Sequence, residues 1–166
     1  MTPRKTARFL IRPARPRDVP VLLKMIRGLA EYERLDQAVE ATAARLRRHG
    51  FRGRPYFQAL LCQKGPTPVG FALYFFTYST FLVRPSLYVE DLYVLPRERS
   101  RGAGRALLSA LARIAVRRRC GRMEWAVLDW NRPAIRLYKR IGAKLHKEWV
   151  VTRLTGRPLR RLAGIR

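Results

Sequence analysis

The amino-acid sequence predicts an α/β fold in which helices cover both faces of a mixed β-sheet. Short apolar runs alternate with segments whose apolar residues recur every three or four positions. Three strand-like runs follow one another in the middle of the chain, which argues against a purely repeated strand–helix–strand pattern. A loop rich in arginine and glycine then separates the last of these runs from a helix-like segment.

The first part of the chain is predicted to form a strand and two helices. Residues 9–12 are a short strand candidate, and the apolar positions from Val19 to Ala30 share one face of an amphipathic helix. Thr42 is a favoured residue at the start of a second, short helix, and Gly50 is a favoured residue at its end.

A β-hairpin is predicted next, because a turn with two prolines and a glycine separates residues 56–63 from residues 69–78. The remaining predicted elements are a strand at 86–95, a helix through Ala106 and Ala115, a strand at 123–128, a helix from Asn131 to Gly142 and a strand at 148–154. The predicted order is strand, two helices, three strands, helix, strand, helix, strand.

The length and composition predict one domain over residues 1–166, because a chain of 166 residues with 48% apolar residues can bury a core. No apolar run is long enough to cross a membrane, so we expect a cytoplasmic protein without membrane association. The basic residues 1–17 leave an organelle transit peptide as an alternative, although residues 9–12 favour a strand. The two cysteines and two histidines lack metal-ligand spacing, so no metal site is expected.

The net charge of +25 results from 36 basic and 11 acidic residues. A field of this sign attracts polyanions such as coenzyme A, nucleic acid or an anionic surface. Arginine greatly outnumbers lysine, and a bias in codon composition is an equally good explanation of that excess.

The loop Arg99-Ser100-Arg101-Gly102-Ala103-Gly104 is typical of a diphosphate-binding turn. Its glycines allow a phosphate to approach the backbone, and the amides at a helix N-terminus face the anion. Arg99, Arg101 and Arg105 add positive charge. The loop lacks the lysine and Ser/Thr ending of a nucleotide P-loop, which favours a single diphosphate over ATP with magnesium.

The strand before this loop contains two adjacent acids, Glu90 and Asp91. Strand alternation predicts one face with Tyr88, Glu90, Leu92 and Val94 and the opposite face with Val89, Asp91 and Tyr93. Only one of the two acids can then face a given cleft. Burial of a carboxylate is costly without a partner, so the two interpretations are a salt bridge to an arginine and a site for a cationic amine or a general base.

These segments together resemble the GNAT acetyltransferase superfamily, whose coenzyme signature is similar to Arg99-x-x-Gly102-x-Gly104. Within it, the chain resembles the diamine (spermidine/spermine) N-acetyltransferase branch and its bacterial relatives. The matching segments are FLIRPA, LAEYE, GFALYFFTY, LYVEDLYV, NRPAIRLYKRIGA and EW. The resemblance implies the GNAT acyl-CoA N-acyltransferase fold, with element order β-α-α-β-β-β-α-β-α-β and an optional last strand. It also implies acetyl-CoA as the acetyl donor.

The resemblance further implies direct attack of an amine on the thioester. Glu90 would draw a proton through a water from an alkyl ammonium, whose pKa of about 10.4 keeps it charged at neutral pH. Tyr138, for which core packing is the alternative role, would protonate the departing thiolate. Backbone N–H groups of residues 90–94 would hold the acetyl carbonyl.

Two sets of binding residues follow from the resemblance. Coenzyme contacts are expected from Leu92, Tyr93, Val94, Arg99, Ser100, Arg101, Gly102, Ala103, Gly104, Arg105, Asn131, Pro133 and Ala134. Acceptor contacts are expected from Tyr32, Glu33, Glu90, Asp91, Glu124, Trp125, Glu148 and Trp149. The chain departs from the polyamine pattern at Ser79 and Phe81, where that branch has an acid and a tryptophan, so a small diamine, a polyamine and a lysine-like amine all stay open as acceptors.

Two other functions stay open at this point. A protein or peptide acetyltransferase would use the same donor with a larger acceptor. A nucleic-acid-binding protein would use the basic clusters at residues 45–48, 117–119 and 157–166. We do not favour a pure nucleic-acid-binding module, because such a module has no use for the coenzyme loop and Tyr138. A basic GNAT-fold acetyltransferase that docks on nucleic acid or ribosomes would combine both features. Relatives of this branch are commonly dimers, so a homodimer is expected by analogy.

Overall fold

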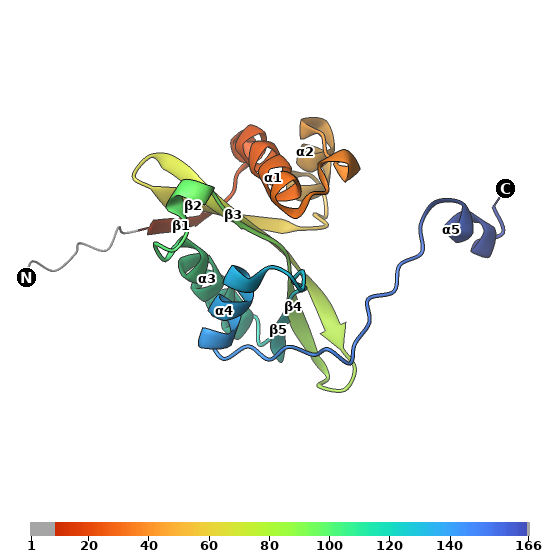
Figure 1. The fold of residues 1–166 in the computed structure, drawn as a ribbon. Coiled ribbons are helices and arrows are strands. Elements are labelled where there is room, and N and C mark those ends of the chain that lie inside the picture. Colours follow the sequence, from red (N-terminus) through yellow and green to blue (C-terminus); the bar gives the residue numbers. More distant parts are fainter. Residues whose placement is uncertain (1–8, 166) are drawn as a thin grey trace, which may run out of the picture. The chain divides into compact units, whose positions relative to one another are not determined.

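The computed structural model describes residues 9–165 and divides into two compact units, one ending at Ala126 and the other beginning at Val127 (Figure 1). The transit-peptide alternative concerns residues 1–17, and the residues before Phe9 lie outside the described part. Among residues 9–165, no helix has the length and apolar content needed to cross a bilayer. The single domain over residues 1–166 stays a prediction.

The first unit is built on a five-stranded sheet with the order β1-β2-β3-β4-β5. Its strands are β1 (Phe9–Pro13), β2 (Gln58–Lys64), β3 (Thr67–Ser79), β4 (Arg84–Val94) and β5 (Arg122–Glu124). Neighbouring strands are antiparallel except β5, which runs parallel to β4. The predicted mixed sheet is therefore confirmed, and so is the hairpin of β2 and β3.

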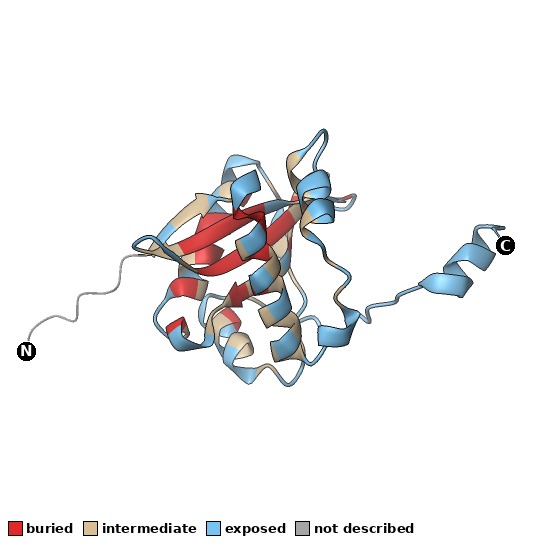
Figure 2. Ribbon diagram, turned by 90° about the horizontal axis from the view of Figure 1, so that it is seen from above, coloured by how far each residue is buried: buried red, intermediate tan, exposed pale blue. Residues whose placement is uncertain are grey.

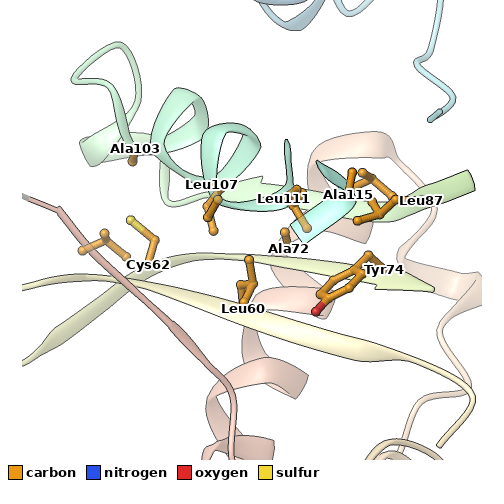
Figure 3. Packing of buried hydrophobic residues seen from close by; sticks show 12 residues of the cluster. Leu60, Cys62, Ala72, Tyr74, Leu87, Ala103, Leu107, Leu111 and Ala115 are labelled. Carbon is orange, nitrogen blue, oxygen red and sulfur yellow. The ribbon is translucent and has the colours of Figure 1, made fainter. Parts of the chain in front are cut away.

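Helices cover both faces of this sheet, as the sequence predicts. Helix α3 (Ala103–Arg117) contributes Leu107 and Leu111 to a buried cluster with Leu60 and Ala72 of the strands (Figure 3). Helix α1 (Val19–Glu33) packs Leu22 and Met25 against the opposite face, beside Leu61, Phe71 and Tyr93. Buried residues accordingly concentrate in the strands and on the sheet-facing sides of these helices (Figure 2).

The second helix, α2 (Ala43–Phe51), begins as predicted but ends later. The Thr42 hydroxyl oxygen accepts a hydrogen bond from the Arg45 amide at 3.2 Å, which caps the first turn. Gly50 does not end the helix. A Cβ at this position would lie 2.4 Å from the Phe57 ring, so glycine is needed here for close packing rather than for a left-handed turn.

Strand β4 contains a β-bulge at Glu90. Leu73 of β3 stands opposite Asp91 and Tyr74 stands opposite Val89, which leaves Glu90 without a partner in β3. The extra residue shifts the alternation of side chains by one position. Val89 consequently packs into the α3-side core together with Leu92 and Val94, so the prediction that Val89 shares a face with Asp91 and Tyr93 is wrong.

Strand β5 is shorter than predicted, because only three of its residues pair with β4. Its ladder ends at the pair Tyr88–Glu124, immediately before the bulge region of β4. The residues that follow Glu124 therefore leave the sheet, and the predicted strand at 123–128 is confirmed only in its first part.

The second unit contains α4 (Arg132–Arg140) and α5 (Gly156–Leu162). The Asn131 side chain caps α4 by accepting a hydrogen bond from the Ala134 amide at 3.4 Å, and Pro133 lies in the first turn, as predicted. The predicted strand at 148–154 is wrong, because this segment has no strand structure. Its side chains favour a strand. However, Trp149 and Val151 are both 78% exposed, and no strand of the described chain pairs with this segment. Helix α5 was not expected.

Candidate active site

The loop before α3 has a backbone suited to an anion. Ser100 and Gly102 both have left-handed conformations, with φ of 60° and 96°. Gly102 is the N-cap of α3, and no side chain of the described residues caps this end. A Cβ on Gly102 would meet no atom within 4 Å, and Arg101 and Arg105 are exposed beside it. Open space, uncapped amides and positive charge together fit the diphosphate of a coenzyme.

Arg99 has a different role from that of the two exposed arginines. Its guanidinium lies 4.2 Å from the centre of the Tyr32 ring and 5.6 Å from that of Tyr93. Its Nε also donates a hydrogen bond to the Val94 carbonyl at 2.9 Å. The side chain thus joins the start of the loop to β4 and to α1, so we expect it to position the loop.

One edge of β4 is open where the coenzyme is expected. Strand β3 pairs with β4 along one side, whereas β5 pairs only with Ser86–Tyr88 on the other side. Residues 89–94 therefore have no strand neighbour on that side in the described sheet. The N–H groups predicted to hold the acetyl carbonyl belong to this segment, between the bulge and the anion-binding loop.

Four acidic residues lie on β4 or near it, on either side of the bulge. The pKa of Asp91 is raised to about 7 by burial and by the nearby charges of Glu90 and Glu33. The pKa of Tyr88 is raised by burial and by the charges of Glu90 and Glu124, and Glu124 stands opposite Tyr88 in β5. Burial also raises the pKa of Glu33, the last residue of α1.

This acidic group is unusual in a chain with a net charge of +25, because it contains four of only 11 acidic residues. Within the described chain, Glu33, Glu90 and Asp91 form no ion pair, and only Glu124 has one, with Arg122 at 3.0 Å. The salt-bridge interpretation of Glu90 and Asp91 therefore has no support among residues 9–165. Glu90 is exposed and Asp91 is half-buried, so both the solvent and a cationic ligand can reach the group.

Of the other predicted acceptor residues, one lies on the opposite face of the sheet and two belong to the second unit. Trp125 packs against the core under α3, on the face of the sheet opposite to Leu73 and Asp91. Glu148 and Trp149 belong to the second unit, where Trp149 is exposed and Glu148 contacts Nδ1 of His146 at 2.9 Å. Tyr32 lies next to Glu33 at the end of α1 and is covered by Arg99.

The second unit holds the remaining predicted residues. Tyr138 lies on α4 and is buried, with 8% of its surface exposed. Asn131, Pro133 and Ala134 form the capped first turn of the same helix. Sequence spacing therefore correctly places all four residues on one helix.

The departure from the polyamine pattern at Ser79 and Phe81 lies in the turn between β3 and β4. Ser79 is buried, and its hydroxyl oxygen accepts a hydrogen bond from the Leu82 amide at 3.2 Å, which stabilises the turn between β3 and β4. Phe81 is 94% exposed at the tip of this hairpin. Ser79 is therefore committed to the turn and does not replace the missing acid.

Sequence reasoning missed the bulge at Glu90, which decides where the two adjacent acids point. The sequence did contain one signal of a bulge. Glu90 and Asp91 are neighbours in an apolar strand, and regular alternation would direct one acid to each face of the sheet. Among residues 9–165, no three His, Cys, Asp or Glu side chains gather to hold a metal ion. The absence of a metal stays a prediction for the whole chain.

Comparison with known proteins assigns the family. Residues 23–143 match the model of the acetyltransferase (GNAT) family. The chain belongs to the GNAT acetyltransferases. The predicted resemblance to this superfamily is thus confirmed, and the protein is an acetyltransferase.

Relatives of this GNAT acetyltransferase support the predicted branch. A thialysine N-epsilon-acetyltransferase of Mus musculus is 39% identical over 165 residues, covering 93% of this chain and 96% of that protein. The L-ornithine N5-acetyltransferase NATA1 of Arabidopsis thaliana is 33% identical over 192 residues, covering 88% of this chain and 84% of that protein. These relatives confirm the resemblance to the diamine acetyltransferase branch.

Solved structures confirm the fold of this GNAT acetyltransferase. An integron cassette protein from the mobile metagenome of V. cholerae superimposes with a TM-score of 0.78 at 26% sequence identity. The match covers 93% of this chain and 97% of that structure. The predicted GNAT fold is therefore confirmed over the matched part of the chain, although the strand at 148–154 is absent.

Proposed function

We propose that this GNAT acetyltransferase transfers the acetyl group of acetyl-CoA to a primary amine of a small cationic acceptor, which is a diamine, a polyamine or a lysine-like amine. The observation that carries this proposal is the group of four carboxylates around the β4 bulge. A positively charged protein repels a cationic amine at long range, so local acids are required to bind it. The thialysine and ornithine relatives support an acceptor with a side-chain amine.

The donor site of this proposal lies along β4 and the loop that follows. The amides at the start of α3 would hold the diphosphate, with Arg101 and Arg105 adding charge. The open edge of β4 at Leu92, Tyr93 and Val94 would hold the rest of the coenzyme by backbone hydrogen bonds. When bound, acetyl-CoA supplies the thioester that the amine attacks.

Glu90 is the base of the proposed reaction. An alkyl ammonium with a pKa of about 10.4 must lose a proton before its nitrogen can attack. The bulge leaves Glu90 exposed beside Asp91, so its carboxylate can take that proton through a water while Asp91 and Glu33 hold the cation. Tyr138 is the proposed acid that protonates the thiolate. Asn131, Pro133 and Ala134, at the start of the same helix, are proposed to contact the coenzyme.

The proposal is tested by following thiol release from acetyl-CoA with diamines, polyamines, lysine analogues and basic peptides. Glu90→Gln is expected to lower kcat about a hundredfold at pH 7. The difference in kcat between Glu90→Gln and the wild type should shrink as the pH rises toward the amine pKa, because the free amine then needs no base. Tyr138→Phe should lower kcat by a similar factor at every pH at which the tyrosine is protonated.

Glu31→Gln and Tyr78→Phe are the matched controls, since both change exposed residues outside the proposed site. Full activity of both Glu90→Gln and Tyr138→Phe would contradict the assigned roles. No thiol release with any amine would contradict the function itself, and release with peptides alone would replace the small acceptor by a protein.

We also infer a cytoplasmic homodimer. The segment 148–154 has the apolar, β-branched composition of a strand, yet Trp149, Val150 and Val151 are each at least 78% exposed. Such a surface is unusual for a monomer and fits pairing with a second copy. Light scattering should give twice the chain mass of 19.3 kDa. Trp149→Glu with Val151→Glu should give the monomer, and a wild-type monomer would contradict the inference.

A further inference from the structure

A basic groove that belongs to no part of the proposed active site lies at the end of α2. It is an open hollow of about 630 Å³, and its lining includes Arg48, His49, Arg52, Arg54 and Tyr56. None of its lining residues is acidic. The groove is thus formed by one helix end and the segment that follows it.

The packing of this segment fixes the shape of the groove. The Tyr56 amide donates a hydrogen bond to the His49 carbonyl at 2.8 Å, and the two side-chain rings meet edge to face with their centres 5.4 Å apart. The Phe57 ring occupies the space that a side chain at Gly50 would need. The three arginines are therefore presented by an ordered backbone rather than by a freely moving loop.

The charge of this groove is uncompensated. Arg48, Arg52 and Arg54 are exposed, and none of them forms an ion pair with a described residue. Elsewhere on α2, Arg45 is paired with Glu40 at 3.6 Å. Three unpaired guanidinium groups within seven residues of chain favour a ligand with several phosphates over a single small anion.

The aromatic residue of the groove distinguishes among polyanions. Tyr56 is 77% exposed, so one face of its ring can stack on a base. A membrane surface would instead require exposed aliphatic side chains for insertion, and the lining contains none larger than alanine. Stacking requires an unstacked base, and RNA exposes such bases in its loops and bulges.

We propose that the groove at Arg48, His49, Arg52, Arg54 and Tyr56 binds single-stranded RNA. The arginines contact successive phosphates, and Tyr56 stacks on a base. This site is distinct from the acetyl-transfer site, so it would hold the enzyme on an RNA-containing partner without taking part in the reaction.

The test is fluorescence anisotropy of a labelled oligo-uridine at a series of salt concentrations. Replacing Arg48, Arg52 and Arg54 together by glutamine should weaken binding at least tenfold and reduce the slope of log affinity against log salt by about 2, because each phosphate contact in a single strand contributes about 0.7. Tyr56→Ala should weaken binding about tenfold with an unchanged salt slope, because stacking releases no ions.

Matched controls separate the groove from the overall charge. Replacement of Arg27, Arg97 and Arg113 by glutamine removes the same charge from exposed positions elsewhere, and Tyr78→Ala removes another exposed tyrosine. Both controls should bind the oligomer nearly as the wild type does. An equal loss in the three-arginine control would overturn the proposal in favour of a diffuse electrostatic effect.

Binding of other polyanions is measured in the same assay and compared with binding of oligo-uridine. Duplex RNA and vesicles containing phosphatidylserine should each bind more weakly than oligo-uridine. Equal or tighter binding of either of them would overturn the assignment to single-stranded RNA. Thermal melting by circular dichroism confirms that each variant is folded, and thiol release measured in parallel should be unchanged by the groove variants.

Discussion

At the scale of single residues, Asp91 is the group whose chemistry depends most on its surroundings. It lies on the α1 side of β4, opposite Leu73, with Glu90 next in the chain and Glu33 at the end of α1. Burial and these two negative charges favour its protonated form and raise its pKa to about 7. A bound ammonium group would reverse this effect by favouring the carboxylate.

Asp91→Asn is expected to stabilise the free protein above pH 7 and to leave its stability unchanged near pH 4. An unfolded aspartate titrates at about 3.9, so between this pH and about 7 the folded protein retains a proton that the unfolded chain has lost. The contribution of Asp91 to stability is therefore lost as the pH rises through this range. Because one pKa unit corresponds to about 1.4 kcal/mol, urea unfolding should show the variant about 4 kcal/mol more stable than the wild type at pH 8.

Asp36→Asn is the control for this change, since Asp36 is exposed and lies outside the acidic group. It should behave like the wild type at both pH values. Equal stability of Asp91→Asn and the wild type at pH 8 would show that Asp91 is already charged and compensated in the folded state. The variant should also raise the KM of a cationic acceptor, because it removes one of the carboxylates that hold it.

At the scale of elements, the acetyl-transfer site depends on how β4 ends and how α3 begins. Beyond the bulge at Glu90, the second half of β4 has no pairing with β5, which leaves its edge open. The left-handed Gly102 then starts α3 without a side-chain cap. An interrupted strand and an uncapped helix cost stability, and both lie where the coenzyme is proposed to bind.

Gly102→Val should weaken the binding of acetyl-CoA more than it destabilises the fold. At a φ of 96°, a side chain costs about 1–2 kcal/mol. This side chain would also occupy the open space proposed for the diphosphate, so we expect the KM of acetyl-CoA to rise at least tenfold while the KM of the amine changes little. Steady-state kinetics with each substrate varied in turn measures both effects.

Gly65→Val separates strain from binding. Gly65 also has a positive φ, of 58°, and open space around it, but it lies in the turn between β2 and β3. This variant should lose a similar amount of stability and keep the KM of acetyl-CoA. A similar rise of that KM in both variants would mean that the coenzyme does not bind at the start of α3.

At the scale of the whole molecule, the net charge of +25 acts on the two substrates with opposite signs. Coenzyme A is an anion that the field attracts, whereas the proposed acceptor is a cation that the field repels. Salt screens both effects, since the Debye length falls from about 30 Å at 0.01 M to about 8 Å at 0.15 M. The local carboxylates act at much shorter distances and are screened less.

Raising the ionic strength over this range should therefore lower kcat/KM for acetyl-CoA several-fold and leave unchanged or raise kcat/KM for the amine. Initial rates are measured at several salt concentrations with each substrate varied separately. They give, for each substrate, the slope of log kcat/KM against ionic strength. Repeating the series with a second salt that has a different anion distinguishes screening from specific anion binding, because screening depends only on the ionic strength. Parallel slopes for the two substrates would contradict this account of the charge.

The sequence by itself determined the family, the mixed sheet and the placement of the main motifs. These features depend on local patterns. Helical spacing places α1 and α3, Thr42 and Asn131 are caps, and the glycines of residues 99–104 mark the turn into α3. Such patterns can be recognised in the sequence, because the interactions that form a helix, a cap or a turn join residues only a few positions apart.

Only the tertiary structure decided the features that need two distant segments. The bulge at Glu90 is defined by its pairing with β3, and it decides which acids gather with Glu33. Position 50 requires glycine because the Phe57 ring fills the space of a side chain, and residues 148–154 form no strand because no partner strand is present in the described chain. Strand propensity is realised only when another backbone completes the hydrogen bonds, and that information is absent from the segment itself.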